Sequence, residues 1–236
     1  MTAKPGAREE ILGRVAAGVA AGVAAGVAAG VTKYPGKADF ATRRAAALAS
    51  LSEQKRGPQP VLGGGLVERF QLKAESLAST VVRVADTAQV PAAVAAYLAQ
   101  GALGNTAVVT PELTGLMWAE NALSIRAGGA VDTDQVGISG CFCAVAETGT
   151  LMLLSGVDTP ATVSLLPETH IAVVSTSRIV ATMEDAFALL RAECGTVPRA
   201  INFISGPSRT GDIEQTIVLG AHGPCRVHLI LVESIR

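Results

Sequence analysis

The sequence predicts an α/β fold in which a mostly parallel sheet lies between layers of helices. From residue 66 onward, β-branched runs of strand length alternate with amphipathic segments of helix length. This alternation is typical of strands joined by crossover helices. Apolar residues make up 49% of the 236-residue chain and charged residues 17%, so a sizeable core can be buried. We therefore expect a three-layer sandwich.

The elements follow from local patterns in chain order. The expected helices are 38–54, 66–78, 91–101, 111–120, 182–193 and a short one over 212–219. The expected strands are 80–84, 106–110, 123–126, 171–175, 200–204 and 226–232. Pro91 suits a first helical position, and Thr182 ahead of two acidic residues is a typical N-cap. The stretch 147–150 lies between two apolar segments, 144–146 and 151–154, and predicts a tight reversal of the chain. Gly149 is expected to adopt the backbone angles that such a turn needs and that glycine adopts most readily.

The N-terminal part differs in composition from the rest. Residues 1–58 are expected to form an arm with a helical extension, and residues 59–236 the α/β domain, because the Gly- and Pro-rich stretch 55–65 is typical of a linker. Val15–Gly30 repeats VAAG four times without Leu, Ile or Phe, so we expect no membrane span. A surface helix or poorly ordered arm, a signal or membrane segment, and a self-associating helix all remain open interpretations.

Charge and cysteine usage exclude some classes of function. With 19 basic and 20 acidic residues, the chain has no overall positive charge to attract nucleic acid. With only 3% aromatics, it also has few side chains on which bases could stack. The four cysteines include no CxxC pair, and the three histidines are scattered. We expect no metal or cofactor in this chain, and reduced thiols in a cytoplasmic protein. Cys141 and Cys143 would share one side of a strand as buried thiols.

The first candidate site is the loop that follows strand 200–204. Small and hydroxyl-bearing residues between a strand end and a helix start suit an oxyanion, because backbone N–H groups point outward there. Arg209 could bind a carboxylate or phosphate with two hydrogen bonds. The expected anion ligands are Ser205, Gly206, Ser208, Arg209 and Thr210. Asp212 could occupy the site itself, and a capped turn without a ligand is the structural alternative.

The second candidate pairs an acid with a histidine. Glu147 beside buried strands and His170 ahead of one are candidate catalytic groups, expected to face the anion loop at the carboxyl end of the sheet. The alternatives are a carboxylate that caps the turn with Thr148 and Thr150, and a hydrogen-bonded structural histidine. His222 in a Gly-Pro turn is a further candidate. We expect no metal site there, because its spacing to Cys225 and His228 fits no common ligand set.

Four stretches in order resemble a known family. GISGCFCAVAETGTL, SLLPETHIAVV, TMEDAFALL and INFISGPSRTGDIEQTIVLGAHGPCRVHLILV are similar to the lactate utilization protein C family (LutC/YkgG), whose defining unit is the LUD domain. The resemblance implies a Rossmann-like sheet in a fold related to ribose-5-phosphate isomerase and CoA transferases. It also implies a part in oxidising L-lactate to pyruvate beside iron–sulfur partner subunits. CoA transferases use a carboxylate nucleophile, for which Glu147 is the candidate here.

The expected function is accordingly that of a non-redox subunit of a lactate-oxidising iron–sulfur assembly, which holds a small carboxylate or phosphate at the loop after residue 204. Two alternatives stay open. One is a stand-alone enzyme that uses Glu147 and His170 on a phosphorylated or CoA-linked substrate. The other is a ligand-sensing module without turnover.

Overall fold

The computed structural model describes residues 40–52, 63–210 and 218–234. The chain divides into two compact units, residues 1–59 and 60–236. In the first unit, helix α2 (Phe40–Ser52) is exposed along residues 41–49. The VAAG repeat lies outside the described residues. None of the helices in the described ranges is long and apolar enough to cross a membrane.

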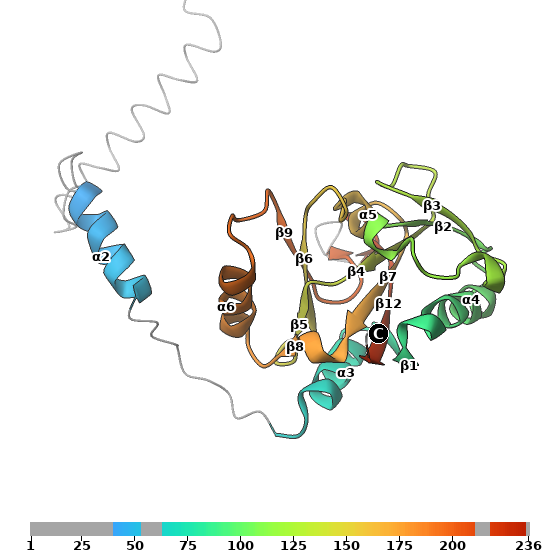
Figure 1. Ribbon diagram of the computed structural model, residues 1–236, viewed down its shortest axis with the longest axis horizontal. Helices are drawn as coiled ribbons and strands as arrows, with labels where there is room; N and C mark the ends of the chain where they lie inside the picture. Colours follow the sequence, from blue (N-terminus) through green and yellow to red (C-terminus); the bar gives the residue numbers. More distant parts are fainter. Residues whose placement is uncertain (1–39, 53–62, 211–217, 235–236) are drawn as a thin grey trace, which may run out of the picture. The chain divides into compact units, whose positions relative to one another are not determined.

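A six-stranded sheet, which we call the large sheet, organises the second unit (Figure 1). Its order is β1-β12-β7-β4-β2-β3, and every neighbouring pair is parallel. The strands are β1 (Thr80–Asp86), β2 (Thr106–Val109), β3 (Ser124–Ala127), β4 (Val136–Gly140), β7 (Thr169–Ser175) and β12 (Arg226–Ser234). The expected α/β fold with a mostly parallel sheet is therefore confirmed.

Both faces of the large sheet are buried, as the apolar composition of β7 and β12 requires. Alternate residues of β12 enter two separate cores: Ile230 belongs to one and Leu229 to the other. Helix α4 (Val90–Gln100) covers the first face through Val94. Helix α3 (Leu66–Ser76) covers part of the second face through Phe70.

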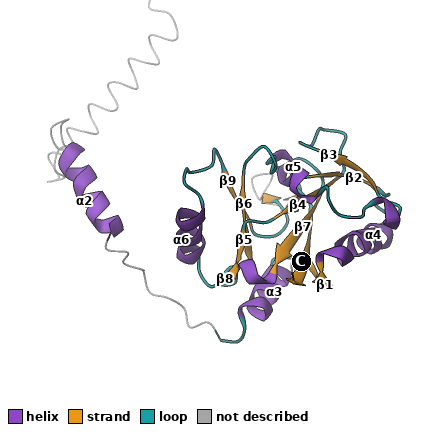
Figure 2. Cartoon of the chain, in the orientation of Figure 1, coloured by secondary structure: helices purple, strands orange, loops and turns teal. Residues whose placement is uncertain are grey.

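A second, four-stranded sheet, which we call the small sheet, completes that second face. Its order is β8-β5-β6-β9, and only the β5–β8 pair is parallel. The strands are β5 (Cys143–Val145), β6 (Thr150–Leu154), β8 (Ile179–Val180) and β9 (Ile201–Ile204). Helix α6 (Met183–Glu193) packs on its outer side (Figure 2). The small sheet is thus an additional layer between α6 and the large sheet.

Local signals account for the ends of several elements. Helix α6 begins at the expected Thr182, whose hydroxyl accepts a hydrogen bond from the Asp185 amide while the Asp185 carboxylate accepts one from the Thr182 amide. This reciprocal capping stabilises the first turn. The expected reversal between β5 and β6 is present, and Gly149 has a φ of 67°.

Three expectations about elements were wrong. Segment 111–120 forms only two 3-10 turns, Pro111–Leu113 and Ala119–Asn121. The Trp118 indole N–H donates to the Leu113 carbonyl and the Thr114 hydroxyl to the Pro111 carbonyl, so side chains supply part of the hydrogen bonding of this segment.

The second error concerns strand 200–204. As β9, it pairs antiparallel with β6 and so belongs to the small sheet. The third concerns the helix over 212–219: Val218–Leu219 form β11, which pairs with β10 (Arg209–Thr210), while residues 212–217 lie outside the described ranges. A short helix, α5 (Thr162–Leu165), was not expected.

The two cysteines also differ from expectation. Cys141 precedes β5 and packs with the core between the sheets, whereas Cys143 packs with the core under α6. They do not share a side, because the chain turns between them on its way from one sheet to the other.

Gly149 offers a test of this packing. A Cβ at Gly149 would lie 2.6 Å from the Ala74 amide nitrogen of α3, whereas a Cβ at Gly104, which also has a positive φ of 76°, would meet nothing within 4 Å. Left-handed strain costs about 1–2 kcal/mol at either position. Overlap with backbone adds roughly 1–3 kcal/mol at Gly149 only. We therefore expect Gly149→Ala to lower the free energy of unfolding more than Gly104→Ala, as measured by urea denaturation. Equal losses would contradict the close approach of this turn to α3.

Candidate functional site

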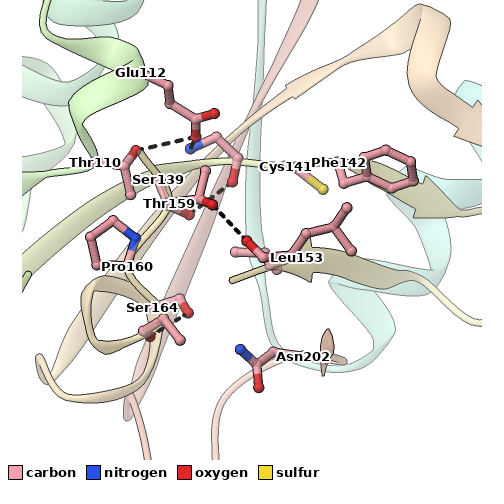
Figure 3. A pocket seen from close by; sticks show the side chains of 13 residues that line it. Thr110, Glu112, Ser139, Cys141, Phe142, Leu153, Thr159, Pro160, Ser164 and Asn202 are labelled. Carbon is pink, nitrogen blue, oxygen red and sulfur yellow. Dashed lines mark hydrogen bonds between the residues drawn. The ribbon is translucent and has the colours of Figure 1, made fainter. Parts of the chain in front are cut away.

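One concave site lies where the large sheet gives way to the small one. A cavity of about 220 Å³ is bordered by the carboxyl ends of β2 and β4, by β6 and β9, and by the segment before α5 (Figure 3). Its lining residues are Thr110, Glu112, Ser139, Gly140, Cys141, Phe142, Leu153, Leu154, Thr159, Pro160, Ala161, Ser164 and Asn202. Parallel sheets bind ligands at this edge of their strands, so we take this cavity as the candidate site.

A wider hollow adjoins it along the same edge. It reaches the ends of β1, β7 and β12 and shares Glu112, Gly140, Cys141 and Phe142 with the cavity. Glu112 therefore stands between the two depressions.

Glu112 is held in place by the strand ends on either side. Its Oε1 accepts hydrogen bonds from the Gly140 amide at 2.9 Å and from the Thr110 hydroxyl at 3.2 Å. Partial loss of water raises the pKa of the Glu112 carboxyl, and the charge of Asp158 raises it further, while the two hydrogen bonds act in the opposite direction. The residue as a whole is exposed, so it is the carboxyl group that faces the drier surroundings at the cavity mouth.

His170 lies directly behind the cavity wall. It is fully buried, and its Nε2 is 2.8 Å from the hydroxyl of Ser139, a lining residue. Because that hydroxyl donates to the Gly140 carbonyl, we assign the imidazole proton to Nε2, which donates to Ser139. Nδ1 has no partner. Burial lowers the pKa of His170 to about 4, so a neutral ring supports Ser139.

The opposite wall is formed by the link between the sheets. Arg178 donates to the Phe142 carbonyl, its guanidinium lies 4.7 Å from the centre of the Phe142 ring, and it forms an ion pair with Glu193. Burial raises the pKa of the Cys141 thiol, and it raises that of Cys143 to about 11. Both cysteines are free thiols that remain protonated at neutral pH.

The predicted turn and the predicted loop come together elsewhere. Thr148, Thr150 and Ser205 form a chain of hydroxyls with oxygen–oxygen distances of 2.7 Å at each step. The side chain of Glu147, which is half-buried, makes no hydrogen bond or ion pair with any described residue.

The loop lies against the C-terminal end of α3. Gly206 approaches the Leu77 carbonyl so closely that a Cβ there would be 2.4 Å from the oxygen. Arg209, which is exposed, donates to the same carbonyl at 3.2 Å. Ser208 donates its amide to the Pro224 carbonyl just before β12, and Thr210 belongs to β10.

The loop is therefore near the amino ends of β1 and β12, and the expected position at the carboxyl end of the large sheet was wrong. The reason is that β9, which leads into the loop, runs in the small sheet. No hydrogen bond among the described residues joins the loop to His170. His222 is exposed in the turn before β12, and Asp212 lies outside the described residues. In the described part of the chain, no three His, Cys, Asp or Glu side chains gather as a metal site.

Sequence reasoning missed Glu112, Thr110 and Ser139. A usable signal existed for each: Thr110 and Glu112 directly follow the buried strand TAVV, and Ser139 is a polar residue near the end of β4. Polar residues at the carboxyl ends of two parallel strands meet at one edge, but the strand order that makes β2 and β4 neighbours is not written in either segment.

Part of the chain is similar in sequence to a known domain family and to named proteins. Residues 130–232 match the family model of the LUD domain. The chain is similar to the LUD domain over this stretch, which is less than half of its length. It is also similar to proteins named lactate utilization protein C: 45% identical over 102 residues to that of Bacillus subtilis, and 39% identical over 120 residues to that of Shouchella clausii. The resemblance expected from the sequence is therefore confirmed.

The LUD match includes Ser139 and His170 but begins after Glu112. The aligned region spans 42% of this chain and 42% of the Bacillus subtilis relative, and 50% and 52% for Shouchella clausii. The chain thus matches about half, or less, of the length of these relatives. A crystal structure of a DUF162 family protein from Deinococcus radiodurans is similar with a TM-score of 0.55 and 25% identity, covering 73% of this chain and 99% of that one.

Burial of neutral His170 makes stability depend on pH. Its pKa of about 4 in the folded chain is below the unfolded value of about 6.5, so the unfolded state binds more protons between these values. Stability should fall as the pH is lowered from about 6.5 to 4, by up to about 1.4 kcal/mol per pH unit for this residue. His228, whose pKa burial also lowers to about 4, adds a similar loss.

We expect His170→Gln to reduce that slope by about one proton, because glutamine can still donate to Ser139 without titrating. Urea denaturation at several pH values measures the slope. Above about pH 7 the difference between the two proteins should be constant. An unchanged slope in the variant would contradict a neutral, buried His170.

Proposed function

We propose that this chain takes part in lactate utilization as a non-redox component of an assembly whose partner subunits carry iron–sulfur clusters and oxidise L-lactate to pyruvate. The observation that carries the proposal is the 38–45% identity, over a little more than 100 residues, to proteins named lactate utilization protein C, and residues 130–232 also match the LUD family model. The LUD family match over residues 130–232 includes β4, whose carboxyl end borders the cavity.

A cytoplasmic location is part of the proposal. All four cysteines are free, and two of them are thiols with raised pKa. Free thiols persist in reducing compartments.

The stand-alone enzyme is the weaker alternative. It requires Glu147 and His170 to act on one substrate, yet His170 is enclosed behind Ser139 and its pKa of about 4 makes it a poor base at neutral pH. No observation in the described structure favours it over a component that acts through partners.

Genetic replacement tests the proposal. We expect the chain, expressed in a Bacillus subtilis strain that lacks its own lactate utilization protein C, to restore growth on L-lactate as sole carbon source. A tagged form should co-purify with iron–sulfur proteins recognisable by their visible absorption. If the folded chain is present but growth does not return, while the host's own protein restores it, the proposed role is contradicted.

Anion binding by the loop after Ile204 stays a prediction within this function. Supporting it, Arg209 is exposed, one of its N–H groups is bonded to the Leu77 carbonyl, and no described carboxylate pairs with it. A charge-assisted hydrogen bond contributes about 1.5–3 kcal/mol.

Arg209→Ala should therefore weaken L-lactate binding roughly ten- to a hundredfold in calorimetry, while Arg191→Ala on the exposed side of α6 should leave it unchanged. If wild type gives no heat with lactate, pyruvate, phosphate or CoA, and Arg209→Ala instead lowers the melting temperature, Arg209 only caps α3 and the anion site is ruled out.

A further inference from the structure

The cavity beside Glu112 has a chemical character opposite to that of an anion site. Five hydroxyl or thiol side chains line it, and in each the polar hydrogen is already used inside the protein. Thr110 donates to Glu112, Ser139 to the Gly140 carbonyl, Cys141 to the Cys143 carbonyl, Thr159 to the Leu154 carbonyl and Ser164 to the Ala161 carbonyl. What these groups can offer a ligand is therefore their lone pairs.

The charges around the cavity point the same way. Glu112 and Asp158 are close enough for the charge of Asp158 to raise the pKa of Glu112, and neither forms an ion pair with a described basic residue. None of the described residues that line the cavity is basic. Arg178 lies on the neighbouring hollow, where Glu193 balances its charge and the Phe142 ring covers it. A carboxylate or phosphate entering the cavity would meet the negative charge of Glu112 and Asp158, with no basic group among the described lining residues to replace its hydration.

The size of the cavity and its other lining residues further restrict which ligands could fit. At about 220 Å³ the cavity is smaller than the usual range for drug-sized ligands. Phe142, Leu153 and Pro160 supply apolar wall between its polar ends. In Figure 3, Glu112 lies at one end of the view and Asn202 at the other. The side-chain amide of Asn202 has no hydrogen bond with any described residue, and this group can both donate and accept.

We propose that this cavity binds a small cationic amine, with its ammonium group against the Glu112 carboxylate and a short carbon chain along the apolar wall. An ammonium group brings three donors and no acceptor, which matches a site whose hydroxyls present only lone pairs. Asn202 at the far end accommodates a second polar group of the ligand. The proposal concerns a ligand site separate from the lactate role and does not depend on it.

Three probes of the same three-carbon skeleton test the match. In 1-amino-2-propanol, 1,2-propanediol and L-lactate, the group next to the carbinol carbon is respectively cationic, neutral and anionic. We expect binding in the order amine, diol, lactate at this cavity, measured by NMR titration of the full chain at about pH 8, where carboxyl groups are ionised. The shifts for the amine should concentrate on Thr110, Gly140 and Asn202.

Glu112→Gln removes the charge and keeps the size of the side chain. It should weaken binding of the amine at least about tenfold, because the charge-assisted hydrogen bond is lost, and it should change binding of the diol little. Glu120→Gln, which alters an exposed carboxylate that does not line the cavity, should bind the amine as wild type does. A thermal melt of each variant establishes that it is folded.

Three results would overturn the proposal: no shifts at the cavity with the amine, equal binding of amine and lactate there, or amine binding that survives Glu112→Gln. Lactate shifts confined to residues 205–210 would instead support the anion loop and leave the cavity proposal intact. Failure to restore growth on lactate would bear on the proposed function alone.

Discussion

The rest of the structure depends on one constraint: a parallel sheet whose central strands are apolar on both sides must be covered on both faces. The side chains of β12 alternate between two cores, with Ile230 on one side and Leu229 on the other. Helix α4 satisfies the first face. The second face needs α3 together with the small sheet, and the small sheet in turn needs α6 over Cys143 and Met152. Each added layer therefore buries apolar surface left open by the previous one.

The candidate site follows from how the chain passes between these layers. β4 ends at Gly140 and β5 begins at Cys143, so only two residues link the two sheets at this point. Such a short link holds the small sheet against the carboxyl edge of the large one. The half-buried Gly140 amide at the start of the link donates to Glu112 and so has a partner inside the protein. The hydrogen bond that satisfies the Gly140 amide thus also holds the Glu112 carboxylate at the mouth of the cavity.

Most strands of the large sheet could be predicted from the sequence as short apolar runs, but β4 (Val136–Gly140) was not expected, because glycine interrupts its apolar pattern. Helix α6 could be predicted from its cap, Thr182. The small sheet could not. β8 is two residues long and β5 three, too short for a period-two pattern, and the pairing of β9 with β6 joins segments about fifty residues apart. Thr150 of the predicted turn bridges to Ser205 of the predicted loop, whereas no hydrogen bond among the described residues joins Glu147 to that loop. His170 was predicted as a catalytic group, but nothing local to it shows that Ser139 stands between it and the cavity.

Opposite charges gather at the two edges of the large sheet for reasons that lie in the backbone. At the amino edge, the C-terminal carbonyls of α3 attract a cation, and Arg209 donates to Leu77 there. Arg226 at the same edge has Glu168 as a partner, whereas no described carboxylate pairs with Arg209. At the carboxyl edge, the amide of Gly140 attracts an anion, and Glu112 supplies it. Each side chain satisfies one backbone group and retains charge that the backbone does not neutralise. The charge that remains is the basis of both proposed sites: an anion beside Arg209 and a cation beside Glu112.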